Sequence, residues 1–351
     1  MYIFDIRTVR RFESNDIVKY LLFILFFTLC GILSQAQEKI TPYREIVVAK
    51  GGSADFRSIA QAIQSTRDLG PGFVRITIKK GVYEEKIVIP DWKTRIILSG
   101  EDREETIIVN SDFSGKHNPL TGVKFSTFNS YTMLVAGDDF IAENLTVKNA
   151  SCGEGQAVAL HVSGSRAIFR NCNIVGCQDT VYASREGSLQ YYEDCYIEGT
   201  TDFIFGEATA VFRNCTIKST GNSYITAAAT PRGQEFGFVF MECALEAAPG
   251  VGAVFLGRPW RPYARTVFLS CTLGPHIVPE GWDPWTGDKM FPAKEKTAFY
   301  AEYGSVGEGS DVSQRVAWSH QLHKRQARIY TLKNILKSTK EAGPWYDRIP
   351  D

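Results

Sequence analysis

The chain has 351 residues, of which 44% are hydrophobic, so it is long and apolar enough to bury a large core. Its 39 basic and 39 acidic residues cancel to a formal net charge of zero. The chain therefore has no excess positive charge that would attract nucleic acid or an anionic membrane. Its composition is compatible with a neutral sugar or ester as the substrate.

The N-terminus has the features of an export signal. Lys19 precedes an apolar run at Tyr20–Leu33 that is short for a membrane span, and small residues suitable for cleavage follow at Ser34–Ala36. We therefore interpret residues 1–36 as a signal peptide and residues 37–351 as a single domain. This interpretation predicts a secreted or periplasmic protein without stable membrane insertion after cleavage. A retained membrane anchor is the alternative.

The cysteine content does not indicate a simple disulfide framework. Removal of the signal segment leaves an odd number, seven, and the pairing of Cys152 with Cys177 stays open. The sequence lacks C-x-x-C, and the pair His320 and His323 lacks the glutamate of the zinc motif H-E-x-x-H. No metal and no other cofactor is therefore predicted.

The first part of the expected domain combines a strand with a short helix. Residues 45–49 predict a strand, and Asp55–Arg67 predicts a helix because its apolar residues recur at helical spacing. Asp55 is the expected N-cap, and the helix is expected to cover the end of a larger structure. From Val74 onward, short β-branched runs are separated by glycine, proline and charged turns. These predicted strands lie at residues 74–79, 86–90, 95–100 and 106–110.

The middle of the chain repeats itself. Each copy has an aromatic residue, a cysteine three residues later and an aliphatic residue two further on, and successive cysteines are 23, 20, 28 and 28 residues apart. The copies are Phe169–Ile174, Tyr192–Ile197, Phe212–Ile217, Phe240–Leu245 and Phe268–Leu273, with Phe140–Leu145 as an earlier copy that carries Glu143 in place of the cysteine. A repeat of this length without a helical pattern predicts a solenoid in which each copy forms one coil of a parallel β-helix.

The polar residue before each repeated cysteine fits the bend between two strands of a coil, because Asn and Asp tolerate the left-handed backbone region. These residues are Asn171, Asp194, Asn214, Glu242 and Ser270. The cysteines would then point inward and form a column of free, buried thiols. Beyond Trp318, the mixed apolar and basic pattern of Gln321–Lys337 predicts a terminal helix, which would help to cover the solenoid.

The repeat also sets the register of two aspartates. Asp179 follows Cys172 by seven residues, and Asp202 follows Cys195 by seven residues. The two carboxylates are therefore expected at the same position on consecutive coils, about 5 Å apart. Two carboxylates this close cannot both ionise freely, which predicts a proton donor beside an anionic nucleophile. Two surface turn residues without a function are the alternative.

Neighbouring residues favour a catalytic site. Gln178 and Gln156 can offer amide N–H groups to an oxyanion, and Arg258 can pair with Asp202 and keep that carboxylate ionised. Each of these residues alone is equally compatible with a surface or structural role. The aromatic residues expected to stack on sugar rings are Trp260, Tyr182 and Phe205.

At this point the sequence resembles the pectin methylesterase family. Five motifs appear in the order of that family: GVYEE (Gly81–Glu85), QAVAL (Gln156–Leu160), GCQDT (Gly176–Thr180), DFIFG (Asp202–Gly206) and LGRPW (Leu256–Trp260). The resemblance extends from about Ile46 to Trp318. It implies an all-β fold, a right-handed parallel β-helix of the pectin lyase-like type with short capping helices. A capped solenoid of this kind is expected to be a monomer.

The resemblance further implies hydrolysis of the methyl esters of polygalacturonate, or pectin, without a metal. Asp202 would attack the ester carbonyl, and Gln156 and Gln178 would bind the oxyanion. Asp179 would protonate the departing methanol and then activate the hydrolytic water. Arg258 would orient Asp202.

Other functions stay open. Two carboxylates about 5–5.5 Å apart also serve retaining glycosidases, so a β-helical polygalacturonase is an alternative, although that mechanism needs no pair of oxyanion amides. A relative that acts on a different ester and a non-catalytic carbohydrate-binding β-helix are further alternatives. The chain has no G-x-S-x-G motif, which disfavours a serine esterase, and His161 is therefore interpreted as structural.

Overall fold

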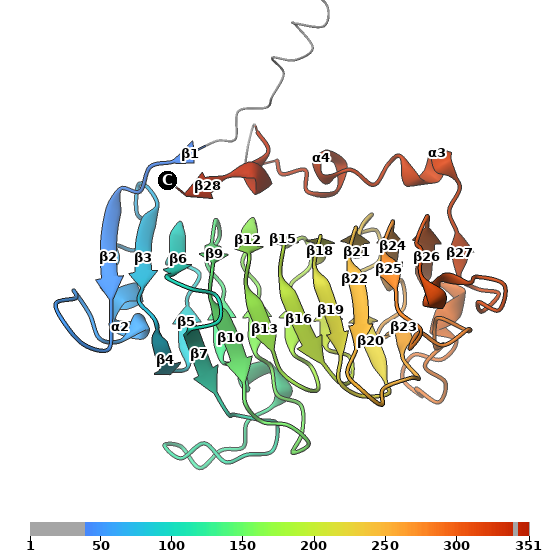
Figure 1. Ribbon diagram of the computed structural model, residues 1–351, viewed down its shortest axis with the longest axis horizontal. Coiled ribbons are helices and arrows are strands. Elements are labelled where there is room, and N and C mark those ends of the chain that lie inside the picture. The colour runs from blue at the N-terminus through green and yellow to red at the C-terminus, as the bar shows by residue number, and fades with distance from the viewer. Residues whose placement is uncertain (1–38, 340–342, 351) are drawn as a thin grey trace, which may run out of the picture. The chain divides into compact units, whose positions relative to one another are not determined.

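Short parallel strands are the main regular element of the computed structural model, which describes residues 39–339 and 343–350. The predicted signal peptide, residues 1–36, lies outside the described residues. Within the unit formed by residues 40–351, hydrogen-bonded neighbours in the three large sheets lie mostly three strands apart in chain order. Each coil therefore contributes one strand to each sheet, and the unit is a parallel β-helix (Figure 1), which confirms the predicted fold.

The three sheets form the three faces of the coil. The eleven-stranded sheet consists of β2 (Arg44–Val48), β3 (Val74–Ile78), β6 (Ile96–Gly100), β9 (Ile141–Glu143), β12 (Ala167–Arg170), β15 (Leu189–Glu193), β18 (Thr209–Arg213), β21 (Phe238–Met241), β24 (Arg265–Leu269), β26 (Phe299–Tyr303) and β27 (His320–Gln321). The eight-stranded sheet consists of β4 (Gly81–Glu84), β7 (Thr106–Asn110), β10 (Thr146–Asn149), β13 (Asn173–Val175), β16 (Tyr196–Gly199), β19 (Thr216–Ser219), β22 (Ala244–Ala247) and β25 (Thr272–Leu273). The seven-stranded sheet consists of β5 (Ile87–Ile89), β8 (Met133–Val135), β11 (Leu160–Val162), β14 (Val181–Ala183), β17 (Ile204–Gly206), β20 (Tyr224–Ala228) and β23 (Phe255–Pro259).

The remaining elements are short. They are the strands β1 (Lys39–Ile40) and β28 (Ile349–Pro350), the α-helices α2 (Ile59–Gln64), α3 (Lys324–Ala327) and α4 (Leu332–Ile335), and the 3₁₀ helices η1 (Thr127–Asn129), η2 (Lys294–Lys296), η3 (Glu308–Ser310) and η4 (Trp345–Asp347). Among the described residues, no helix has the length and apolar character needed to cross a membrane.

The sequence repeat forms the core of the solenoid. Its aromatic residues stack from coil to coil, and the ring centroids of the five successive pairs from Phe140 to Phe268 lie 4.4–5.7 Å apart. The five repeated cysteines are free and buried, as predicted. Both columns follow the coil spacing of about 4.8 Å, because parallel pairing places equivalent residues next to one another.

The predicted bends are also present. The residue before each repeated cysteine has a positive φ, between 46° at Asn171 and 57° at Glu242. The earlier copy behaves in the same way, with a φ of 54° at Asn144. A polar residue in the left-handed region turns the chain from the eleven-stranded sheet into the eight-stranded sheet, which explains why this position is polar in each copy.

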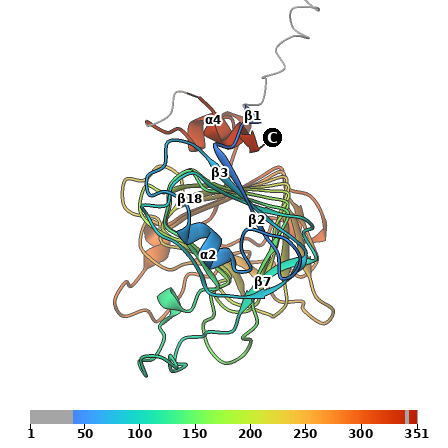
Figure 2. The ribbon, with the colours of Figure 1, turned by 90° about the vertical axis from the view of Figure 1, so that its left-hand side faces the viewer.

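Helix α2 covers one end of the coil stack (Figure 2) and buries Ile59 and Ile63 in the core. The expectation that Asp55 is its N-cap was wrong. Ser58 is the N-cap, and its side chain accepts a hydrogen bond from the Gln61 N–H. The Asp55 carboxylate instead accepts a hydrogen bond from the Val47 N–H, 2.8 Å away, because the helix starts later than the apolar pattern indicated.

The predicted single helix at Gln321–Lys337 was wrong as well. This segment forms two helices of four residues, α3 and α4, after the end of β27. His323 and Thr331 each accept a hydrogen bond from a backbone N–H of the following turn, so each starts a new helix. The segment runs back along the outside of the eleven-stranded sheet (Figure 1), where its apolar residues, including Ile335 and Leu336, cover that face.

Candidate active site

Asp179 and Asp202 occupy equivalent positions on consecutive coils of the seven-stranded sheet. Each stands two residues before a strand, and the first residues of these strands, Val181 of β14 and Ile204 of β17, are register partners. Both aspartates have a positive φ, 65° and 49° respectively. Their backbone N–H groups donate to carbonyl groups of the next coil, which fixes the turn that presents each carboxylate.

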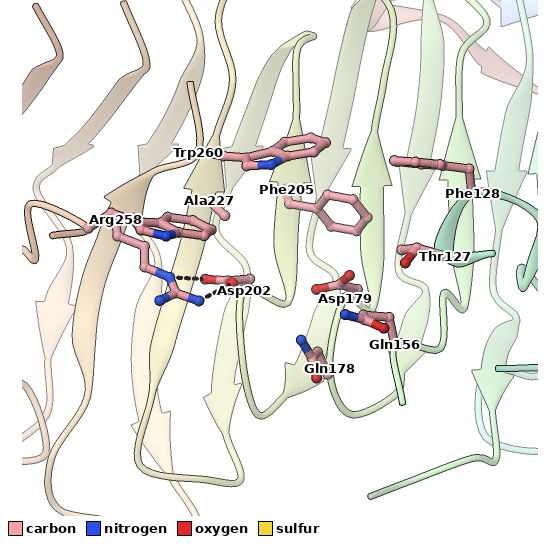
Figure 3. A pocket seen from close by; sticks show the side chains of 11 residues that line it. Thr127, Phe128, Gln156, Gln178, Asp179, Asp202, Phe205, Ala227, Arg258 and Trp260 are labelled. Atoms are coloured by element: carbon pink, nitrogen blue, oxygen red, sulfur yellow. Dashed lines mark hydrogen bonds and ion pairs between the residues drawn. The ribbon is translucent and has the colours of Figure 1, made fainter. Parts of the chain in front are cut away.

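Arg258, on β23, forms a two-pronged ion pair with Asp202. Its Nε and Nη2 donate to the two carboxylate oxygens over 3.0 and 2.7 Å (Figure 3). The guanidinium also lies between two aromatic rings, 3.9 Å from the Tyr224 centroid and 3.8 Å from the Trp285 centroid. Stacking on both sides orients the guanidinium plane, so Arg258 presents both donors to Asp202 in one geometry.

The two carboxylates differ in their electrostatic surroundings. Burial, together with the charge of Asp202, raises the pKa of Asp179 to about 8, although Arg258 opposes the rise. Burial also raises the pKa of Asp202, and here the hydrogen-bonded guanidinium of Arg258 opposes it directly. Because Arg258 stabilises the Asp202 carboxylate by hydrogen bonds as well as by its charge, Asp202 ionises first and Asp179 keeps its proton at neutral pH.

Both predicted glutamines lie in the same cavity as the carboxylates. Gln156 precedes β11 and Gln178 precedes Asp179, and their side chains lie below the two carboxylates in the view of Figure 3. The cavity has a volume of about 340 Å³. Neither side-chain amide makes a hydrogen bond to another described residue, so their N–H groups are available to a ligand.

Aromatic rings form the opposite wall. Phe205 and Trp260 line the cavity, with ring centroids 5.8 Å apart. Tyr182, the third predicted substrate-binding residue, does not line this cavity but stacks on Phe205 at 4.5 Å. Tyr182, Phe205 and Ala227 form one row across the seven-stranded sheet, because they are consecutive register partners on β14, β17 and β20.

His161 occupies the same row one coil earlier, as the partner of Tyr182. Its Nε2 lies 2.8 Å from the Ser184 Oγ, and burial lowers the pKa of His161 to about 4. The ring is therefore neutral at neutral pH and packs at 4.4 Å from the Tyr182 ring. These contacts agree with its interpretation as a structural residue.

Four residues of the cavity were not predicted from the sequence. They are Thr127, Phe128, Ala227 and Trp285. Thr127 and Phe128 come from the 3₁₀ helix η1, which the repeat does not indicate. Trp285 follows β23 by 26 residues in a loop with no periodic pattern. Of the four, only Ala227 could have been predicted from the strand register, because it pairs with both Phe205 and Arg258.

The fold and this cavity define a β-helical hydrolase that presents a carboxylate pair beside two amides and aromatic rings. Comparison with known proteins identifies the class as carboxylic ester hydrolases. The family model described as Pectinesterase matches residues 45–339, and the chain belongs to this family.

Individual relatives support the same assignment. Pectinesterase 31 of Arabidopsis thaliana is 34% identical over 86% of this chain and 95% of its own length. A probable pectinesterase/pectinesterase inhibitor 64 of the same plant is also 34% identical, over 85% of this chain. The chain spans about half of that second relative, 52% of its length.

Solved structures agree with the fold. The pectin methylesterase from carrot is 30% identical, has a TM-score of 0.77 and is matched over 86% of this chain and 95% of its own. A pectin methylesterase in complex with a hexasaccharide is 31% identical, with a TM-score of 0.72, over 84% of this chain and 97% of its own.

Proposed function

We propose that the protein is a pectin methylesterase that hydrolyses the methyl esters of homogalacturonan to pectate and methanol. Family membership supports the ester-hydrolase chemistry, and a related pectin methylesterase is known in complex with a hexasaccharide. The observation that carries the proposal is the pair of stacked carboxylates, of which only Asp202 is held by an arginine.

In the first step the Asp202 carboxylate attacks the ester carbonyl carbon. Negative charge develops on the carbonyl oxygen, and the amide N–H groups of Gln156 and Gln178 stabilise it. The bond to the methoxy oxygen breaks, and the protonated carboxyl of Asp179 supplies the proton that methanol needs to leave. The products of this step are methanol, an acyl intermediate on Asp202 and an ionised Asp179.

In the second step a water molecule attacks the acyl carbon. Asp179, now a carboxylate, accepts a proton from this water, and the same two amides stabilise the second oxyanion. The bond to the Asp202 oxygen breaks and releases the galacturonate carboxyl group. Both aspartates return to their initial protonation states, so no cofactor is consumed.

Substrate recognition is assigned to the aromatic wall. The faces of Phe205 and Trp260 are suited to the apolar faces of sugar rings, and Tyr182 supports Phe205 from the adjacent coil.

We further propose that residues 1–36 are a cleaved export signal and that the mature protein is a secreted or periplasmic monomer. The disulfide between Cys152 and Cys177 supports an oxidising compartment. N-terminal sequencing of the exported protein should begin at residue 37, and light scattering should give the mass of one chain. A retained leader or a dimer would contradict the respective part of this proposal.

The decisive assay compares methanol release from highly methylated pectin by the parent protein and by Asp202→Asn. Loss of the nucleophile is expected to lower kcat by at least about 10³-fold, since no neighbouring group can form the acyl intermediate. Asp194→Asn is the matched control, because Asp194 has a similar left-handed backbone with a φ of 56° but lies at a solvent-exposed bend outside the cavity.

The same assay separates the alternatives. Methanol release without new reducing ends supports the esterase, whereas new reducing ends without methanol would establish a glycosidase. Equal rates for the parent and Asp202→Asn would overturn the nucleophile assignment. Acetylated and other esterified galacturonans, tested in parallel, identify a relative with a different ester preference.

A further inference from the structure

The disulfide between Cys152 and Cys177 is attached directly to the two glutamines. Cys177 immediately precedes Gln178, and Cys152 stands four residues before Gln156. The bridge therefore joins the loop that carries one amide to the turn that carries the other. A single cross-link lies within four residues of both proposed oxyanion donors.

The loop on the Cys152 side has few other restraints. Residues 152–155 make no hydrogen bond or ion pair with any described part of the chain, so the disulfide is their one covalent link to the coil beneath. The next restraint along the chain is the hydrogen bond that the Gln156 carbonyl accepts from the Ser114 N–H at 2.8 Å. Two of these four residues are glycines with positive φ, Gly153 at 82° and Gly155 at 153°. Glycine gives the backbone additional conformational freedom, which a covalent cross-link reduces.

The turn on the Cys177 side is firmly held. The Cys177 carbonyl accepts hydrogen bonds from the Thr200 N–H at 2.9 Å and from the Thr180 hydroxyl at 3.1 Å. The two segments meet in one backbone hydrogen bond, from the Ala157 N–H to the Gln178 carbonyl at 3.1 Å. The bridge thus fastens a loosely held loop to a rigid turn.

Neither glutamine side chain is positioned by a hydrogen bond to another described residue. Its location therefore depends on its backbone and on packing. A donor displaced by about 1 Å from the developing oxyanion loses much of its effect, because the hydrogen bond must fit the transition state.

We propose that the Cys152–Cys177 disulfide is a positioning element of the oxyanion site, which holds the Gln156 loop against the turn of Gln178 and thereby raises kcat. This inference rests on the proposed esterase function. The bridge acts through the two amides and does not touch the substrate. Cys152 is exposed to solvent and Cys177 is partly exposed, so the bridge is also accessible to a dithiol.

The first test removes the bridge by the double substitution Cys152→Ser/Cys177→Ser. We expect kcat for methanol release to fall about 10-fold to 100-fold with KM changed less than about 3-fold, since the loss affects the transition state rather than substrate binding. The thermal midpoint of each variant is measured, and rates are compared well below it, so that partial unfolding does not contribute.

Dithiothreitol provides the same test on the unaltered parent. The dithiol gives two electrons and two protons to the bridge, which becomes two thiols, while the reagent closes to its cyclic disulfide. The parent should lose activity and regain it on reoxidation. The double serine variant is the matched control, since it keeps the five buried free cysteines and should not respond.

A non-additivity test distinguishes positioning from a general structural role. In a Gln156→Ala/Gln178→Ala background, removal of the bridge should cause little further loss of kcat, because the groups that it positions are absent. Hydrogen exchange at the Ala157 amide supplies a readout without turnover, and its protection should fall when the bridge is reduced.

The outcomes separate the two proposals. An active parent whose kcat is unchanged without the bridge would overturn this inference and leave the esterase function intact. The same fold-loss in the parent and in the double-alanine background would also overturn it. A parent protein that releases no methanol from pectin would overturn the proposed function and this inference with it.

Discussion

Arg258 makes two chemically identical side chains unequal. Asp179 and Asp202 have equivalent backbone positions and similar burial. Only Asp202 receives two charge-assisted hydrogen bonds, and the Arg258 guanidinium that donates them contacts the rings of Tyr224 and Trp285. The proposed division into nucleophile and proton donor therefore comes from Arg258, which lies two coils beyond Asp202, and not from the aspartates themselves.

The pKa of Asp179 predicts how activity depends on pH. In the proposed mechanism methanol leaves only when Asp179 is protonated, so kcat/KM, which reports the groups of the free enzyme, should fall as pH rises through about 8. Methanol release at pectin concentrations well below KM, corrected for spontaneous ester hydrolysis, measures this fall. A kcat/KM that stays level well above pH 8 would show that Asp179 is not the acid. The Asp194→Asn control should show the same fall of activity with rising pH as the parent protein.

The same pKa has a consequence for stability. Because the folded pKa of about 8 exceeds the unfolded value of about 3.9, the folded chain binds more protons between these limits, and stability falls as pH rises through this window. The site is thus least stable where Asp179 is forced to ionise beside Asp202. A buried acid pair of this kind is maintained by the surrounding coils at a cost to stability.

At the scale of elements, helix α2 depends on a residue distant in the sequence. The Glu85 carboxylate accepts hydrogen bonds from the Ile59 and Ala60 N–H groups, each at 3.0 Å, and from the Ser58 hydroxyl at 2.7 Å. It therefore satisfies the free donors at the start of the helix. This role explains the second glutamate of the GVYEE motif in structural rather than catalytic terms.

Substitution of Glu85 by Ala should lower the free energy of unfolding by about 1–2 kcal/mol, because buried helix donors lose their acceptor. The neighbouring Glu84→Ala is the matched control, since Glu84 is exposed and makes no hydrogen bond with another described residue. Urea unfolding of both variants gives the comparison. Equal midpoints would refute the capping role, and kcat should not change in either protein.

The regular part of the molecule was readable from sequence because it is periodic. The spacing of the repeated cysteines predicted the coils, the inward columns and the register of Asp179 with Asp202. Helix boundaries were less accessible. Asp55 and Ser58 are both good capping residues, and the choice between them depends on Glu85, which is not adjacent in the sequence.

The irregular part of the site was not predictable for a related reason. Thr127, Phe128 and Trp285 reach the cavity through segments without a repeat, so their position depends on loop paths that local patterns do not specify. The pairing of Cys152 with Cys177 also needed the fold, because an odd number of cysteines permits many combinations.

At the scale of the whole unit, the seven-stranded and the eleven-stranded sheets have different roles. The seven-stranded sheet carries the cavity, and the eleven-stranded sheet carries an outward row of apolar residues that water would otherwise reach. The C-terminal segment covers this row through Ile335, Leu336, Trp345 and Tyr346. We therefore expect a substitution beneath the C-terminal segment to lower stability without changing catalysis.

Trp345 allows this separation to be tested. Its side chain is 1% exposed, packs in the cluster over the eleven-stranded sheet and donates to the Leu336 carbonyl at 2.8 Å. Trp345→Ala should lower the free energy of unfolding by about 3–5 kcal/mol, since it removes a large buried ring and leaves a carbonyl without its donor. Trp92→Ala, at a side chain 52% exposed, should have little effect.

Measured well below the unfolding midpoint, kcat of Trp345→Ala should equal that of the parent, because no residue of the cavity belongs to the cluster that contains Trp345. Loss of kcat in step with stability would mean that the covered face transmits its packing through the core to Asp179 and Asp202. Equal unfolding midpoints for Trp345→Ala and Trp92→Ala would instead mean that the C-terminal segment adds no stability. In that case the coils alone, with their aromatic and cysteine columns, would hold the catalytic register.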